Sequence, residues 1–176
     1  MLEAALMLET PREVSNSFDE IVHQRETCVL RTAFRILGNW ADAEDVAQEV
    51  FLRLHRHGIT FETDAAFGAW VYRVTVNLCL DRARVRTKRP SVEMPELHSK
   101  DVSAEASAIR DQEKQLLMAA LETLPPRERA AIVLREIEGL STGEVAAIMG
   151  SAEATVRSQV AKAMGRLRQI LSKGAR

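Results

Sequence analysis

The chain has 176 residues, of which 46% are hydrophobic, 28% are charged and 5% are aromatic. This composition is typical of a folded protein, and the length allows one compact domain or two small ones. Ala, Leu, Glu and Arg dominate while aromatic residues are few, so we expect helices in preference to sheets. The formal net charge of −1 argues against a uniformly basic protein that binds nucleic acid through its net positive charge alone.

The two cysteines, Cys28 and Cys79, have neither the spacing of a zinc site nor a disulfide framework. Both lie in apolar helical patterns, and we interpret them as buried thiols. No apolar run approaches the roughly 18 residues that a membrane-spanning helix needs. Residues 1–14 also lack the basic start of a signal peptide. We therefore expect a cytoplasmic protein without membrane insertion.

Charge is distributed unevenly along the chain. Residues 73–89 contain six basic side chains against one acid, and residues 125–176 contain nine against five. Residues 42–49 carry four acids and no base. Solvated helix faces would explain any one of these blocks alone. Residues 90–115, between the two basic blocks, carry six acids and three bases. Together, two basic blocks and separate acidic ones indicate two nucleic-acid contacts and a separate protein contact.

The first half of the chain predicts three helices. The first runs from Ser17, a potential N-cap, to residue 37, and Gly38 ends it. The second spans residues 41–57, and the third spans residues 65–86 after a loop. The second has an apolar stripe at helical spacing, formed by Ala43, Val46, Ala47, Val50, Phe51 and Leu54. The third is expected to bury Phe67, Trp70, Val71, Val74 and Leu78.

The second half predicts four more helices after a linker. Residues 90–107 mix Pro, Ser, Glu and Asp without periodicity, which is typical of a flexible linker. A helix over residues 108–124 is broken by Pro125-Pro126, and another is expected over residues 127–138. The sequence thus predicts an all-α fold of two small helical domains. Their boundaries are an N-terminal extension at 1–16, a first domain at 17–89, the linker at 90–107 and a second domain at 108–176.

A helix-turn-helix is predicted within the second domain. Ser141 caps a short helix over residues 142–149, a three-residue turn containing Gly150 follows, and a longer helix runs from residue 153 to about 172. This geometry presents the second helix to the major groove of DNA, although an ordinary helical hairpin has the same outline. The outward side chains able to contact phosphates or base edges are Thr155, Arg157, Ser158, Gln159 and Lys162.

Four segments in this order resemble one family. They are residues 42–53 (DAEDVAQEVFLR), 67–82 (FGAWVYRV and NLCLDR at its two ends), 121–141 (LETLPPRER and LREIEGLS) and 144–158 (EVA and TVRS). The chain is similar to the extracytoplasmic-function (ECF, group IV) family of bacterial RNA polymerase sigma factors. The resemblance implies two helical domains that guide the polymerase to promoters, with no cofactor and no enzymatic activity.

The resemblance also implies roles for particular residues. The implied polymerase-binding set is Asp42, Asp45, Gln48, Glu49 and Arg53. The implied minus-ten DNA-binding set is Thr60, Thr63, Asp64, Tyr72, Arg73, Asn77, Arg82, Arg84 and Arg86. The helix-turn-helix residues above would read the minus-thirty-five element. The implied partners are core RNA polymerase (the clamp helices of its largest subunit and the flap of the second largest), promoter DNA and an anti-sigma factor.

Two further expectations concern particular side chains. The spacing of Phe67 and Trp70 favours core packing over base stacking, whereas Tyr72 lies off that stripe and is expected to be more open. Gln159 stands where the family often has Arg, which would shift a guanine preference toward adenine.

Other functions remain as alternatives. Glu20-x-x-His23 has the spacing of a dimetal carboxylate enzyme, but the sequence contains only one such motif. A conventional helix-turn-helix regulator would need a ligand-binding domain, for which residues 1–90 show no alternating strands. A sigma-like protein that binds polymerase without initiating transcription is the third alternative.

Overall fold

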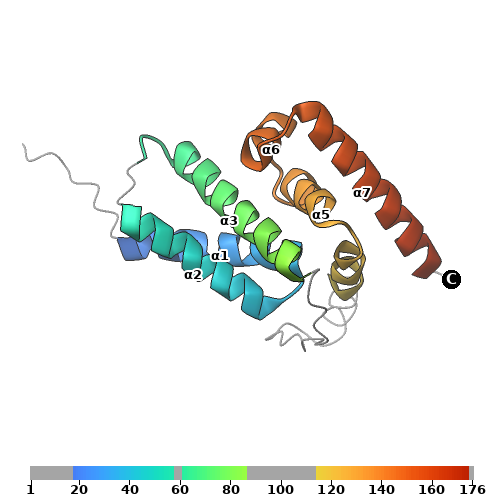
Figure 1. The fold of residues 1–176 in the computed structure, drawn as a ribbon, viewed down its shortest axis with the longest axis horizontal. Coiled ribbons are helices and arrows are strands. Elements are labelled where there is room, and N and C mark those ends of the chain that lie inside the picture. The colour runs from blue at the N-terminus through green and yellow to red at the C-terminus, as the bar shows by residue number, and fades with distance from the viewer. Residues whose placement is uncertain (1–17, 58–60, 87–113, 175–176) are drawn as a thin grey trace, which may run out of the picture.

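The computed structural model describes residues 18–57, 61–86 and 114–174, which are helical without any strand among them (Figure 1). The all-α class is therefore confirmed. We call the first three helices the N-terminal unit: α1 (Phe18–Leu37), α2 (Trp40–His57) and α3 (Asp64–Arg86). We call the remainder the C-terminal unit: residues 114–122, α5 (Pro126–Ile132), η1 (Val133–Ile137), α6 (Thr142–Met149) and α7 (Glu153–Gly174). The expected linker and the expected cap Ser17 lie outside the described residues.

Helix α2 follows its predicted pattern. All six residues of the apolar stripe are at most 8% exposed. Their burial fixes the rotation of the helix and turns its acidic face to solvent. The helix begins where the Asn39 side chain accepts a hydrogen bond from the Asp42 N–H at 2.9 Å. Gly38, at φ +70°, ends α1 in the left-handed conformation that suits glycine.

Helix α3 is buried on more of its circumference than the sequence indicated. Phe67 and Val71 are buried as expected, and Trp70 packs partly buried against the core. The second half of the helix also buries Thr75, Val76, Cys79 and Leu80, of which only Cys79 was predicted. The reason is that α3 packs against α1 and α2 on one side and against α6 on another.

The helix expected over residues 127–138 is confirmed in its extent, since residues 126–137 are continuously helical. It is α-helical only to Ile132, however, and Val133–Ile137 form a π-helix, which the sequence did not indicate. The Glu138 N–H donates to the Val133 carbonyl at 2.9 Å, five residues back, in place of the α-helical spacing of four. Val133 and Leu134 are fully buried. Because the wider turn changes the direction of the side chains that follow, it affects where Glu138 points.

The helix-turn-helix is confirmed in its local geometry. The Ser141 hydroxyl accepts from the Glu144 N–H at 3.2 Å, and the Glu144 carboxylate accepts from the Ser141 N–H at 2.7 Å. This reciprocal capping box begins α6 at the expected residue. Gly150, at φ +59°, ends α6, and α7 starts at Glu153 as predicted.

The two units pack directly against each other. Helix α3 contacts α5 and α6, and α1 contacts α5 and η1 (Figure 1). The buried apolar residues of both units form one continuous core. Gly38 lies so close to the Glu122 side chain that a Cβ at residue 38 would collide with it. The sequence predicted two domains but gave no sign of this contact.

Candidate polymerase and promoter interfaces

The implied polymerase-binding residues lie together on the outer face of α2. Asp45 and Gln48 are exposed, and Asp42, Glu49 and Arg53 are half-buried. Arg53 donates to Glu49 one helical turn earlier, with Nε and Oε1 2.7 Å apart. The face is therefore acidic and polar, which suits docking onto a basic partner helix.

Sequence reasoning missed one residue of this face. Leu52 is 44% exposed and follows Gln48 by four residues, so both side chains lie on the same side of α2. The available signal was an apolar residue outside the stripe. Single exposed leucines are common on protein surfaces, and here Leu52 adds apolar area beside the polar groups of this face.

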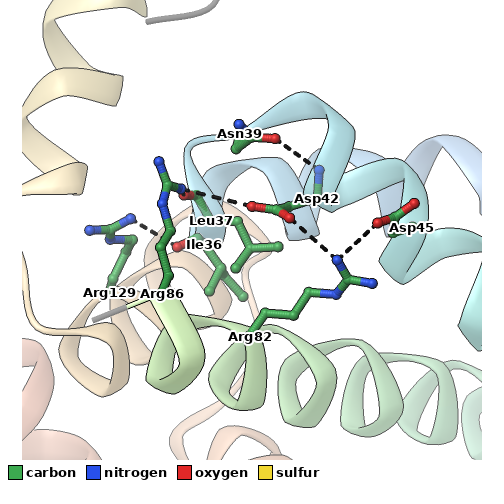
Figure 2. Close-up of polar contacts among 8 residues, drawn as sticks. All are labelled: Ile36, Leu37, Asn39, Asp42, Asp45, Arg82, Arg86 and Arg129. Atoms are coloured by element: carbon green, nitrogen blue, oxygen red, sulfur yellow. Dashed lines mark hydrogen bonds and ion pairs between the residues drawn. The ribbon is translucent and has the colours of Figure 1, made fainter. Parts of the chain in front are cut away.

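Two arginines of the implied minus-ten set pair with the acidic end of α2 (Figure 2). Arg82 Nη1 lies 3.3 Å from Asp42 Oδ1 and 3.0 Å from Asp45 Oδ2. Arg86 Nη1 lies 3.9 Å from Asp42 Oδ2 and donates to the Leu37 carbonyl at the end of α1 at 3.1 Å. The end of α3 is thus fastened to α1 and α2, and two charges predicted for DNA already have carboxylate partners.

The start of α3 positions further residues of this set. The Thr63 hydroxyl accepts from the Ala66 N–H at 3.1 Å and so caps the helix. Asp64 pairs with Arg25 of α1. Thr60 lies outside the described residues. Thr63 therefore caps α3, and Asp64 joins the start of α3 to α1.

The rest of the set lies along α3. Asn77 is exposed, as the resemblance requires of a base contact. Arg84 is exposed and lies 3.3 Å from Asp81 one turn earlier. Arg73 is exposed and donates to the Ala147 carbonyl of α6 at 3.0 Å. The basic stretch of α3 therefore has its first residue, Arg73, bound to the C-terminal unit, and Arg82 and Arg86 near its other end bound to α2.

Tyr72 is not open, so that expectation was wrong. Its hydroxyl donates to Glu138 Oε2 at 3.1 Å and lies 3.4 Å from Cys28 Sγ. Burial, reinforced by Cys28 and Glu138, raises the pKa of Tyr72 well above its usual range. The partner of Tyr72 comes from the C-terminal unit, which a pattern within α3 cannot reveal. Phe67, by contrast, packs in the core as expected, with its ring centroid 5.0 Å from that of Phe61.

The helix-turn-helix presents most of its predicted residues. Thr155, Arg157, Ser158 and Lys162 are exposed on α7. Arg157 pairs with Glu153 at 3.1 Å on the helix surface. Gln159 is half-buried, and its Oε1 is enclosed without a hydrogen-bond partner in the described part of the chain. Gln159 therefore lies at the margin of this face rather than at its centre.

The remaining sequence hypotheses concern thiols, metals and membranes. Cys79 is fully buried as predicted, and burial raises the pKa of its thiol to about 12, whereas Cys28 is only half-buried. The side chains of Glu20 and His23 lie outside the described part of the structure. Across residues 25–56, 61–86 and 114–172, no cluster of His, Cys, Asp or Glu is arranged to hold a metal. Within the described helices, none is long and apolar enough to span a membrane.

Comparison with known sequence families gives two matches. Residues 21–89 match Sigma-70 region 2, and residues 114–167 match Sigma-70, region 4. With the fold described above, they define a protein of the sigma-70 class. The region 2 match includes α2 and α3, and the region 4 match includes α5, α6 and most of α7.

Individual relatives narrow this class. The chain is 38% identical over 161 residues to ECF RNA polymerase sigma factor SigE of Mycolicibacterium smegmatis, covering 89% of this chain and 62% of that protein. It is 33% identical over 156 residues to ECF RNA polymerase sigma factor SigM of Mycobacterium tuberculosis, covering 88% of this chain and 77% of SigM. The chain belongs to the ECF family of RNA polymerase sigma factors.

A solved structure shares the fold. The sigma factor RpoE of Bartonella quintana, solved in complex with the anti-sigma factor NepR, aligns with a TM-score of 0.70. The alignment has 23% sequence identity and covers 88% of this chain and 96% of RpoE. The all-helical arrangement described above is therefore also that of a sigma factor.

Proposed function

We propose that this chain is a sigma factor that binds core RNA polymerase in the cytoplasm, directs promoter-specific transcription initiation and is held inactive by an anti-sigma factor. The observation that carries the proposal is that region 2 and region 4 match one chain in order. A helix-turn-helix regulator of the conventional kind would not carry region 2. The activity is one of binding and positioning, and the chain would perform no catalysis of its own.

The proposal assigns a partner to each interface. The first domain, residues 17–89, would dock the outer face of α2 on the clamp helices of the largest polymerase subunit. The same domain would bind the minus-ten element through α3, with Asn77 at a base edge. The second domain, residues 108–176, would place α7 in the major groove at the minus-thirty-five element and contact the flap of the second-largest subunit. Residues 90–107 would link them.

A sigma-like protein that binds polymerase without initiating transcription is the second candidate. The observation that favours it is that Tyr72, Arg82 and Arg86 already have partners within the chain. Core binding without promoter-specific transcripts would identify this function.

Polymerase docking is tested by binding of the full chain to core polymerase. We expect the double variant Asp45→Ala/Gln48→Ala to raise Kd at least tenfold, equivalent to about 1.4 kcal/mol. Glu44→Ala is the matched control, because Glu44 is an exposed acid of α2 outside the implied set. Equal affinities for the double variant and the control would contradict the assignment of this face.

DNA binding by α7 is tested with the polymerase holoenzyme on a promoter fragment. We expect Arg157→Ala and Lys162→Ala each to weaken binding and to reduce its salt dependence by about one charge. Arg168→Ala, at an exposed position further along α7, is the control. A salt dependence that is the same in all three variants would remove α7 from the DNA interface.

A further inference from the structure

The contact between the two units is centred on a single carboxylate. The side chain of Glu138, only 12% exposed, accepts hydrogen bonds from three side chains of the N-terminal unit. Its Oε1 accepts from Thr32 Oγ1 at 3.0 Å and from Arg35 Nη1 at 2.7 Å. Its Oε2 accepts from Tyr72 at 3.1 Å. We call Glu138 with these three partners the latch.

These bonds satisfy the requirements of buried polar groups. Thr32 is fully buried, so its hydroxyl needs a partner, and Glu138 provides it. Arg35 supplies the opposite charge that a carboxylate enclosed to this degree requires. The side-chain hydrogen bonds described for Glu138 all reach the other unit.

Two further hydrogen bonds flank the latch. Arg129 of α5 is buried and donates to the Ile36 carbonyl of α1 at 2.9 Å (Figure 2). On the other side, Arg73 of α3 donates to the Ala147 carbonyl of α6. The contact therefore extends from the end of α1 to the first helix of the helix-turn-helix, and it holds the units in one orientation.

This orientation is incompatible with binding both promoter elements. The minus-ten and minus-thirty-five positions are about 25 base pairs apart, or roughly 85 Å along B-DNA at about 3.4 Å per base pair. In this structure the two DNA-reading units are joined by a 3.0 Å hydrogen bond between Arg73 and Ala147. Tyr72 and Arg73 of the implied minus-ten set are occupied by Glu138 and by the Ala147 carbonyl.

We propose that the free chain is self-inhibited: the latch holds α6 and η1 against α1 and α3, and it must open before α3 can bind DNA. The functional consequence rests on the proposed sigma function, whereas the closed geometry does not. Opening separates one charged contact, a small number of hydrogen bonds and the apolar packing between the units. The surfaces of polymerase and promoter together supply the energy for this, since they bind only the separated units.

The test reverses the charge at the centre of the latch. Glu138→Arg places a cation against Arg35, and we expect the free chain to open. Its radius of gyration by small-angle X-ray scattering should then rise by several ångströms. The control Glu136→Arg adds the same charge at an exposed position of η1. The double exchange Arg35→Glu/Glu138→Arg restores an ion pair of opposite polarity, and we expect it to return the radius to that of the unaltered chain.

A second readout measures whether opening exposes α3. A fluorescent single-stranded oligonucleotide of random sequence should bind Glu138→Arg at least fivefold more tightly than Glu136→Arg, although both variants carry the same net charge. An unchanged radius in Glu138→Arg with intact helical content would overturn the latch. An increased radius with equal oligonucleotide affinity would overturn self-inhibition. Failure of the unaltered chain to bind core polymerase would instead refute the proposed function. The scattering and oligonucleotide measurements would still test whether the latch holds the two units together.

Discussion

Replacing Arg129 with methionine should be among the most destabilising single changes in this chain. Its guanidinium donates to three backbone carbonyls: that of Ile36 at 2.9 Å, that of Leu124 at 3.2 Å and that of Glu122. These carbonyls lie at or near the ends of two helices, where the helix supplies no further N–H groups. Arg129→Met keeps most of the apolar stem but leaves them without this donor.

The magnitude follows from the number of bonds and the cost of burial. A hydrogen bond from a charged donor contributes about 1.5–3 kcal/mol, so three would give at least ~4.5 kcal/mol. Burial opposes this and lowers the pKa of Arg129, because it removes the cation from water. The buried Nε also has no hydrogen-bond partner within the described residues. We therefore expect a net loss of about 3 kcal/mol in the free energy of unfolding.

Urea unfolding followed by far-UV circular dichroism measures this loss. Arg127→Met is the control, because Arg127 is an exposed residue of the same helix. We expect the control to change the free energy of unfolding by less than about 0.5 kcal/mol. If Arg129→Met costs under about 1 kcal/mol, the three bonds do not hold the helix ends together, and the account of this contact is wrong.

Four further predictions concern individual groups. At pH 8, Ellman's reagent should modify Cys79 only when the chain unfolds, since burial raises the pKa of its thiol to about 12; rapid modification in the native state would contradict its burial. Ser141→Ala should cost about 1 kcal/mol in urea unfolding through loss of the cap on α6, and an unchanged midpoint would refute the capping box. Hydrogen bonds from Ser141 lower the pKa of Glu144, so its contribution is present above about pH 4.3 and is lost as the pH falls through the lowered pKa; Glu144→Gln should remove this part of the acid dependence of stability. Tyr72 is the single tyrosine of the chain, and because burial raises its pKa, its phenolate absorbance should appear only with unfolding; ionisation near pH 10 in the folded chain would contradict its enclosure.

Features encoded locally were predictable from the sequence. The stripe of α2 and the start of α6 depend on residues within one or two helical turns of each other, and both are as expected. The outward position of Asp45, Gln48 and Lys162 follows from the same periodicity.

Features that depend on distant partners were not predictable. Thr32 and Tyr72 meet Glu138 across 106 and 66 residues of sequence, and no periodic pattern encodes such a meeting. The π-helix was missed because its residues are as apolar as those of an α-helix, and only burial from several sides determines the wider turn. The pairing of Arg82 with α2 was missed because a basic run is typical of a DNA-binding surface as well as of a structural ion pair.

The central claim is that this chain gives core RNA polymerase its promoter specificity. Run-off transcription with purified core polymerase on a pool of promoter fragments, with and without the protein, tests it most directly. We predict transcripts that depend on the protein and share two upstream sequence elements, and that are lost with Asp45→Ala/Gln48→Ala but retained with Glu44→Ala. An identical transcript pattern with and without the protein would contradict the claim.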